Sequence, residues 1–297
     1  MNKKISVIIV TYNRKNDLDL CLQSIFNSTY NNYEIIVVDN ASEDDTVMFL
    51  ENKYSNSINL IKSPVNLNAG GGRNLGAKNA SGDYFLFIDS DNVIDFNMIN
   101  ELYLEIEKGN NCGMIGPLMY YYEKKNIIWL SFANINMWTS KSKYEGNLEE
   151  DKGQYNLVRE TGHLPNVFMV RKNIWELVNG IDEIYGIMYE ESDLAEKIKK
   201  IGYKILITPK AKTYHNTPMS YSKDLEFNNK RFYYTTRNRI IFMRKNATKI
   251  QLFVFYSIFM HVLNFYYFIN ILKFGKLNII STFFSAIKDG VTIKIEK

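Results

Sequence analysis

The chain has 297 residues, of which 46% are hydrophobic, enough to fill the core of one large domain or of a domain with an appendage. Its net charge of +4 is too small to indicate, by itself, a protein that binds nucleic acid. Cys21 and Cys112 fall in predicted core positions without metal-ligand spacing, so we expect buried, reduced thiols in a cytosolic protein. The charged start, Met1–Lys4, precedes a short strand pattern, so we expect no signal peptide.

The first third of the chain alternates strand and helix patterns. Apolar runs predict buried strands at Ile5–Val10, Glu34–Val38 and Ile58–Ile61. Apolar residues at helical spacing predict helices at Asp17–Phe26 and Glu43–Tyr54, the second with Ser42 as its N-cap. Strands that alternate with helices predict a parallel sheet with right-handed crossovers, an architecture that suits nucleotide binding.

Two acidic residues follow the fourth predicted strand. Tyr84–Ile88 is an unbroken apolar run, and it stops at Asp89-Ser90-Asp91. Carboxylates just beyond a buried strand lie where open α/β sheets bind ligands, and they can hold a divalent cation that carries substrate phosphates. The alternative is a turn that uses Asp for its hydrogen bonds.

The glycine-rich stretch Asn66–Gly76 matches neither known phosphate motif. Leu75 occupies the last glycine position of the dinucleotide fingerprint, and Ala77 stands where a phosphate loop requires lysine. One interpretation is close approach of the backbone to a ligand, with Arg73 beside it. The other is a flexible turn that enters a helix.

The middle of the chain carries weaker patterns. We expect a helix around Phe96–Lys108, a strand at Gly113–Met119, a hairpin arm at Ile127–Asn136 and an exposed polar loop at Thr139–Gln154.

Three carboxylates, Glu190, Glu191 and Asp193, open a predicted helix that ends at Gly202. They can stabilise the helix dipole, or they can raise one another's pKa and provide a general base. A strand at Lys204–Thr208 precedes His215, which is either a structural residue or a ligand.

The C-terminal part is basic and then apolar. Lys223–Lys245 predicts a basic, aromatic helix that contains Thr236–Arg239. Gln251–Leu272 is almost wholly apolar between basic flanks, which favours a helix lying on a bilayer. A membrane span and a core helix of a soluble protein remain as alternatives.

Seven segments, in this order, resemble the family 2 inverting glycosyltransferases, and among them the rhamnosyltransferase-type members of bacteria and archaea. They are Val7–Arg14, Glu34–Ser42, Asn68–Gly76, Gly82–Asp91, Gly180–Leu194, Pro209–His215 and Thr236–Arg239. The resemblance implies an α/β fold of the GT-A type, with a mainly parallel central sheet and a helical C-terminal extension. It implies a nucleotide-sugar-binding half at 1–110, an acceptor-binding half at 111–222 and the extension at 223–297.

The resemblance also implies roles for individual residues. Those expected to bind the nucleotide sugar are Thr11, Tyr12, Arg14, Asp39, Arg73, Asp89 and Ser90. Asp91, with His215, is expected to hold Mn²⁺ or Mg²⁺, and Arg237 to add a phosphate contact.

The sequence departs from the family pattern at the expected base. Family members usually carry Glu-Asp where this chain has Glu190-Glu191, and the Asp is the usual base. We therefore expect Glu191 to be the general base, with Glu190 as the alternative. A few positions before this pair, family members commonly carry an aromatic residue, and this chain has Gly186 there.

The expected activity is transfer of a hexosyl or rhamnosyl group, with inversion, from a nucleoside diphosphate sugar to a hydroxyl of a glycan or lipid-linked acceptor in surface polysaccharide or glycoconjugate synthesis. We expect the protein at the inner face of the cell membrane, peripheral or with one span, without a nucleic-acid partner. A nucleotidyltransferase and a non-catalytic protein that binds nucleotide sugars are the alternatives.

Overall fold

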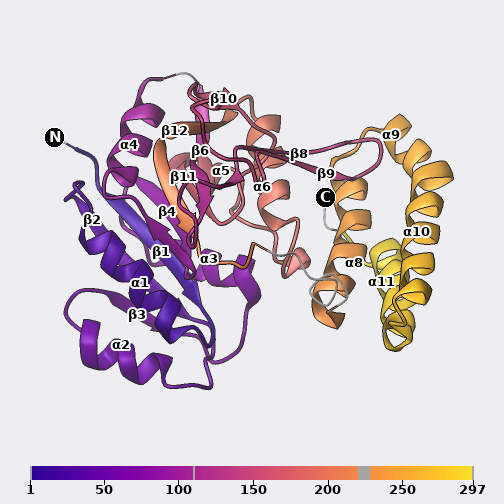
Figure 1. The fold of residues 1–297 in the computed structure, drawn as a ribbon, viewed down its shortest axis with the longest axis horizontal. Helices are drawn as coiled ribbons and strands as arrows, with labels where there is room; N and C mark the ends of the chain where they lie inside the picture. Colours follow the sequence, from indigo (N-terminus) through magenta and orange to yellow (C-terminus); the bar gives the residue numbers. More distant parts are fainter. Residues whose placement is uncertain (1, 110, 220–227, 296–297) are drawn as a thin grey trace.

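The structure is a computed structural model that describes residues 2–109, 111–219 and 228–295. A central sheet is covered by helices on both faces, and a helical extension stands beside it (Figure 1). The strands are β1 (Ile5–Thr11), β2 (Tyr33–Asp39), β3 (Asn59–Lys62), β4 (Tyr84–Asp89), β5 (Asn92–Ile94), β6 (Cys112–Tyr121), β7 (Ile128–Leu130), β8 (Phe132–Ile135), β9 (Ser142–Glu145), β10 (Arg159–Glu160), β11 (Val167–Arg171) and β12 (Lys204–His215). The α-helices are α1 (Lys15–Phe26), α2 (Thr46–Tyr54), α3 (Asn68–Lys78), α4 (Met98–Glu107), α5 (Lys172–Leu177), α6 (Glu190–Lys200), α8 (Asn229–Asn246), α9 (Lys249–Val254), α10 (Met260–Lys273) and α11 (Ile280–Thr292).

The strands of the central sheet follow the order β10-β12-β6-β11-β4-β1-β2-β3. Strands β1 to β4 are parallel to one another, and β6 is parallel to β12. Strand β11 lies between β4 and β6 and is antiparallel to both, so β6 and β12 have the same direction as β4. The short strands β5, β7 and β10 add antiparallel pairs. The predicted α/β fold with a mainly parallel sheet is confirmed.

Both faces of the sheet are buried. Residues of β1 such as Val7 and Ile9 pack with side chains of α1, α2 and α4, and Ile8 packs on the opposite face with α3, α5 and α6. This arrangement explains why the strands are continuous apolar runs without alternation. Cys21 and Cys112 are free thiols in the core, as predicted.

The glycine-rich stretch was predicted as a loop, and this is wrong: Asn68–Lys78 forms helix α3. A Cβ atom at Gly72 would lie 2.6 Å from Val10 Cγ1, and one at Gly76 would collide with Ile8. The glycines therefore let α3 pack closely against β1. The close backbone approach at Gly72 and Gly76 is made to the sheet.

Three further local predictions need correction. Ser42 does not cap α2, which begins at Thr46, and its hydroxyl accepts a hydrogen bond from the Asn13 amide instead. Part of the expected loop at Thr139–Gln154 forms β9, which pairs with β8 in a hairpin. Strand β12 extends to His215, well beyond the predicted end, because after an irregularity that follows Thr208 it pairs with β6 again at Lys212–His215.

The helical extension comprises α8 to α11 (Figure 1). Helix α8 begins at Asn229, and 223–227 of the predicted basic helix lie outside the described residues. Helices α9 and α10 are joined by a π-helical turn at Phe255–Phe259. The resulting helix, Lys249–Lys273, contains an apolar stretch with a mean hydropathy of 1.6, and only 6% of that stretch is buried. Such exposure excludes a core helix of the sheet domain and leaves both membrane interpretations open.

Candidate active site

The predicted polar residues gather at one edge of the sheet. Thr11, Asp39 and Asp89 end β1, β2 and β4, and parallel strands bring their carboxyl ends to the same edge. Because β11 is antiparallel to β4, its beginning lies at this edge, and the Asp89 amide donates to the carbonyl of Asn166 at 3.0 Å. Asn166 is thus a site residue that the sequence did not indicate.

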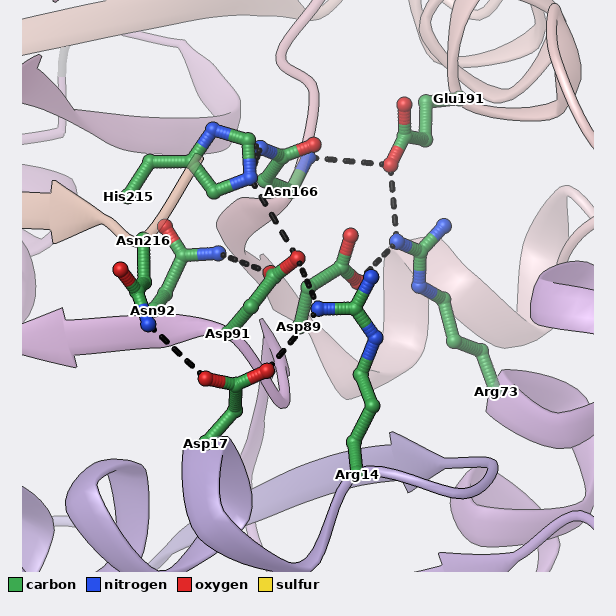
Figure 2. A network of polar contacts seen from close by, with 10 residues as sticks. All are labelled: Arg14, Asp17, Arg73, Asp89, Asp91, Asn92, Asn166, Glu191, His215 and Asn216. Atoms are coloured by element: carbon green, nitrogen blue, oxygen red, sulfur yellow. Dashed lines mark hydrogen bonds and ion pairs between the residues drawn. The ribbon is translucent and has the colours of Figure 1, made fainter. Parts of the chain in front are cut away.

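Arg73, from α3, contacts Asp89 and Glu191 at this edge (Figure 2). Its Nη2 atom is 2.6 Å from Asp89 Oδ1 and 2.8 Å from Glu191 Oε1, and its Nη1 atom is 3.7 Å from Glu190 Oε1. The Arg73 side chain is only 3% exposed. Burial alone would lower the pKa of Arg73, but the three carboxylates outweigh it and raise that pKa. Arg73 is therefore a permanent buried cation that joins Asp89 to the glutamate pair.

Glu190 and Glu191 differ in their partners. Burial, and then the charge of Glu191, raises the pKa of Glu190 to about 8. Burial also raises the pKa of Glu191, while Arg73 opposes that rise. Glu191 Oε1 accepts a hydrogen bond from the backbone amide of Asn166 at 3.0 Å, and it also contacts Arg73. Glu190 Oε2, in contrast, is buried and has no hydrogen-bond partner among the described residues. Negative charge is therefore better stabilised on Glu191 than on Glu190.

The third carboxylate of this helix start, Asp193, does not join the pair. It is fully buried, and it accepts hydrogen bonds from Tyr185 Oη at 3.0 Å, Lys245 Nζ at 2.8 Å and Asn246 Nδ2 at 2.7 Å. These contacts attach α6 to α8. Asp193 consequently has a structural role.

Asp91 forms a second centre with Arg14 and His215 (Figure 2). Its Oδ2 atom is 3.0 Å from Arg14 Nη1 and 3.5 Å from His215 Nε2. Burial would raise the pKa of Asp91, but the hydrogen bond from His215 and the charge of Arg14 hold that pKa below its usual value. Arg14 also contacts Asp17 at 3.2 Å, and Asp17 accepts from Asn216 Nδ2 at 2.8 Å. Asp17 and Asn216 were not predicted from the sequence.

The residues around Asp91 fit a divalent cation that phosphate oxygens of a substrate would also coordinate. A carboxylate oxygen and an imidazole nitrogen converge there, and Arg14 already places positive charge on the same oxygen. In the described part of the chain, no three His, Cys, Asp or Glu side chains are close enough to hold a metal ion together. Two protein ligands leave positions for phosphate oxygens and water, as Mg²⁺ sites in phosphate-binding proteins do.

The predicted nucleotide-binding residues include buried acceptors without partners. Among the described residues, nothing donates a hydrogen bond to Asp39 Oδ1 or pairs with Thr11 Oγ1, although Asp39 Oδ2 accepts from the Ser42 amide at 3.1 Å. Such groups are costly to bury unless a ligand or water satisfies them. Ser90 is also buried, between Asp89 and Asp91 in the sequence, and Tyr12, which directly follows β1, is 40% exposed.

Arg237, expected to contact phosphate, makes its backbone contacts on the segment that precedes α6. Its guanidinium donates to the carbonyls of Ile184 and Tyr185, on the segment before α6. Gly186 follows with a φ of +67°, and a Cβ atom there would lie 2.8 Å from Tyr234 Cε1. The space that an aromatic residue would need is therefore filled by Tyr234, from α8.

The sequence of residues 6–171 matches the family described as glycosyl transferase family 2. The chain belongs to this family. The match ends at Arg171, so the described residues from Lys172 onward, including Glu191 and His215, lie beyond it.

Two relatives of this family 2 glycosyltransferase match it over part of their length. An uncharacterized glycosyltransferase of Haemophilus influenzae is 32% identical over 111 residues, 37% of this chain and 37% of the relative. The UDP-Glc:alpha-D-GlcNAc-diphosphoundecaprenol beta-1,3-glucosyltransferase WfaP of Escherichia coli is 33% identical over 132 residues, 44% of this chain and 51% of the relative. The chain thus spans from about a third to a half of these two relatives.

Solved structures share the fold. TarS 1-349 of S. aureus in complex with UDP-GlcNAc superimposes with a TM-score of 0.61 at 21% identity, over 97% of this chain and 80% of that one. GalNAc-T7 with UDP, GalNAc and Mn²⁺ has a TM-score of 0.61 at 17% identity, over 79% of this chain and 48% of that one. The fold of this family 2 glycosyltransferase is therefore of the GT-A type.

Proposed function

We propose that this protein transfers a hexosyl or rhamnosyl group from a nucleoside diphosphate sugar to a hydroxyl of a glycan or lipid-linked acceptor, with inversion, in the synthesis of surface polysaccharide or glycoconjugate. The observation that carries the proposal is the link from Asp89 through Arg73 to Glu191. It joins a carboxylate at the nucleotide-binding edge of the sheet to a buried carboxylate with a raised pKa. The name of WfaP and the UDP-GlcNAc bound to TarS support the same chemistry.

The donor occupies the ends of β1 and β2 in this proposal. The unpartnered acceptors of Thr11 and Asp39 bind polar hydrogens of the base and ribose, and Tyr12 covers the nucleotide. Asp89 and Ser90 contact the ribose. Arg14 gives up its contact with Asp91 and contacts the diphosphate.

Asp91 and His215 hold the divalent cation, Mn²⁺ or Mg²⁺. When bound, the cation supplies Lewis-acid chemistry that neutralises the charge on the departing diphosphate. The Mn²⁺ bound with UDP in the structure of GalNAc-T7 supports this assignment.

Glu191 is the general base. It takes the proton of the acceptor hydroxyl as the oxygen forms a bond to the anomeric carbon, and the bond from that carbon to the diphosphate breaks on the opposite face. Arg73 and the Asn166 amide hold one oxygen of Glu191 in place. The Glu191 side chain is 15% exposed, against 7% for Glu190, so Glu191 is the more accessible of the two to an acceptor.

The extension brings the enzyme to its acceptor at the membrane. We assign donor binding to 1–110, acceptor binding to 111–222 and membrane contact to 223–297. The outward side chains of Lys249–Lys273 include Ile250 and Phe253, each 70% exposed, and Phe265, 68% exposed. An apolar surface next to basic residues suits a helix that lies on the anionic inner face of the cell membrane.

A thermal-shift panel of nucleotide sugars, with and without Mn²⁺, tests the donor half of the proposal. A true donor raises the unfolding midpoint of the full chain, and the rise depends on Mn²⁺ and is lost in Asp91→Asn. Nucleoside diphosphate release in the presence of acceptor then separates a transferase from a protein that only binds nucleotide sugars. Pyrophosphate release from a nucleoside triphosphate would instead identify a nucleotidyltransferase.

A further inference from the structure

The segment that leads into Glu190 has an unfavourable backbone. Met188 and Tyr189 have φ values of +66° and +72°, in the left-handed region, although both carry a Cβ atom. Two such residues in succession persist only where their surroundings enforce the conformation. They stand directly before the Glu190-Glu191 pair, so what holds them also sets the start of α6.

Asn238, from α8, makes the contacts that hold this segment. Its Nδ2 atom lies 2.7 Å from the carbonyl oxygens of Tyr185 and Ile187 and 2.8 Å from that of Met188. Its Oδ1 atom accepts from Arg237 Nε at 2.9 Å, which fixes the orientation of the amide. Asn238 is fully buried, so water does not compete for these bonds.

Neighbouring contacts close the segment from both sides. Arg237 donates to the carbonyls of Ile184 and Tyr185, and its guanidinium stacks 4.9 Å from the centre of the Tyr234 ring. On the other side, Tyr189 Oη donates to the carbonyl of Ser140 in the turn between β8 and β9, at 3.0 Å. Among the described residues, the side chain of Asn238 contacts three carbonyls of this segment and that of Arg237 contacts two.

We infer that Asn238 is a positioning residue for Glu191. It holds the left-handed Met188-Tyr189 backbone, and that backbone delivers the carboxylate to Arg73 at the edge of the sheet. The inference rests on the proposed function in that Glu191 is the base. It gives Thr236–Arg239 a role in placing the base.

Amide hydrogen exchange of the full chain, without substrate, tests the clamp directly. In Asn238→Ala, exchange of the amides of 186–190 should accelerate by about tenfold or more, because the carbonyls lose their shared donor. Asn238→Ser keeps one donor, so its exchange rate at 186–190 should lie between those of wild type and Asn238→Ala. Ile271→Ala, in α10 and equally buried, packs in a different cluster with Phe232 and Phe283, so it controls for a cavity in the extension and should leave exchange of 186–190 unchanged.

Activity measurements test the consequence for Glu191. With the donor found in the panel, Asn238→Ala should lower the transfer rate by about tenfold to a hundredfold, since a carboxylate displaced by an ångström is poorly aligned. Binding of UDP with Mn²⁺ should stay within about twofold of wild type. Water that reaches the loosened glutamates lowers their pKa, so the acidic limb of the pH–rate profile should move to lower pH, and Ile271→Ala should not move it.

Unchanged exchange of 186–190 in both Asn238 variants would overturn the inference, and so would faster exchange with an unchanged transfer rate and pH profile. If the wild-type protein transfers no sugar, the proposed function fails instead, and the exchange result still decides whether Asn238 holds the segment.

Discussion

Arg73 Nη2 lies 2.8 Å from Glu191 Oε1, and the same nitrogen lies 2.6 Å from Asp89 Oδ1. One buried guanidinium nitrogen therefore serves a carboxylate at the end of β4 and another at the start of α6. Any change at Arg73 should affect both sides of the site together.

Arg73→Met should therefore destabilise the protein and stop transfer. Without the guanidinium, Asp89, Glu190 and Glu191 repel one another in a buried site, and the loss of a buried ionic partner costs about 3–5 kcal/mol of unfolding free energy. Arg73→Lys keeps the charge but not the planar fork, so it should be intermediate. Urea unfolding and transfer assays measure both effects. Wild-type stability in Arg73→Met would show that the ion pairs do not stabilise the fold.

Glu190 should make stability depend on pH. Its pKa rises from an ordinary 4.5 to about 8 in the folded protein, so the unfolded chain loses this proton first as pH increases. The contribution of Glu190 to the free energy of unfolding is therefore fully present below about pH 4.5 and declines as the pH rises towards 8. Glu190→Gln removes the titration, so its stability relative to wild type should increase between pH 5 and pH 8. Equal slopes of urea-unfolding free energy against pH in the two proteins would contradict this.

Arg14 and a divalent cation should compete for Asp91. Arg14 Nη1 already contacts Asp91 Oδ2 at 3.0 Å, so Arg14→Ala should bind Mn²⁺ alone several-fold more tightly than wild type does. Asp91→Asn should abolish that binding. Calorimetric titration with Mn²⁺ measures both affinities without any turnover. Retention of wild-type Mn²⁺ affinity in Asp91→Asn would place the cation elsewhere.

The exposed apolar face of the extension should bind membranes. Replacement of Ile250, Phe253 and Phe265 by serine removes three large side chains from the bilayer, so vesicle affinity should fall by at least about a hundredfold. Flotation with anionic vesicles measures this affinity. Deletion of 250–297 is a poorer test, because Phe283 of α11 packs on Phe232 of α8.

Met48→Ser with Leu177→Ser is the matched control for vesicle binding, since both residues are exposed apolar side chains outside the extension. Unchanged flotation of the triple variant would remove the membrane role of this face. Resistance of the full-length wild-type protein to carbonate extraction would favour a span over a surface helix.

The strands and their acidic ends were predictable because the signal is local. Apolar runs defined β1, β2 and β4, and parallel pairing brought Asp39 and Asp89 to one edge. Asn166 was missed because β11 is short and antiparallel, which reverses the end that faces the site. Asp17 and Asn216 pair across 199 positions of sequence, a distance at which no pattern indicates contact.

Helix α3 and Arg237 show how tertiary packing overrides local patterns. Glycine is a poor helix former, so a glycine-rich stretch predicts a loop, yet the lack of a Cβ atom at Gly72 is what lets α3 meet Val10. Arg237 resembles a phosphate ligand in sequence. Its position on α8 brings it to the carbonyls of Ile184 and Tyr185, which no local pattern reveals.

Substitutions of the two glutamates should distinguish their roles. Glu191→Asp shortens the side chain and should lower transfer by misplacing the carboxylate about an ångström. Glu190→Gln places a neutral side chain where burial favours the protonated carboxyl, so transfer should change much less. Both variants should bind the donor as wild type does, because the glutamates act on the acceptor side.

The transfer rate of Glu191→Gln, measured as acceptor-dependent release of nucleoside diphosphate, tests the central claim most directly. The amide keeps the size and hydrogen bonding of the side chain but cannot take a proton, so the rate should fall by about 10²–10⁴-fold with donor affinity unchanged. A Glu191→Gln enzyme that transfers at the wild-type rate would show that Glu191 is not the base, and loss of transfer in Glu190→Gln alone would assign the base to Glu190.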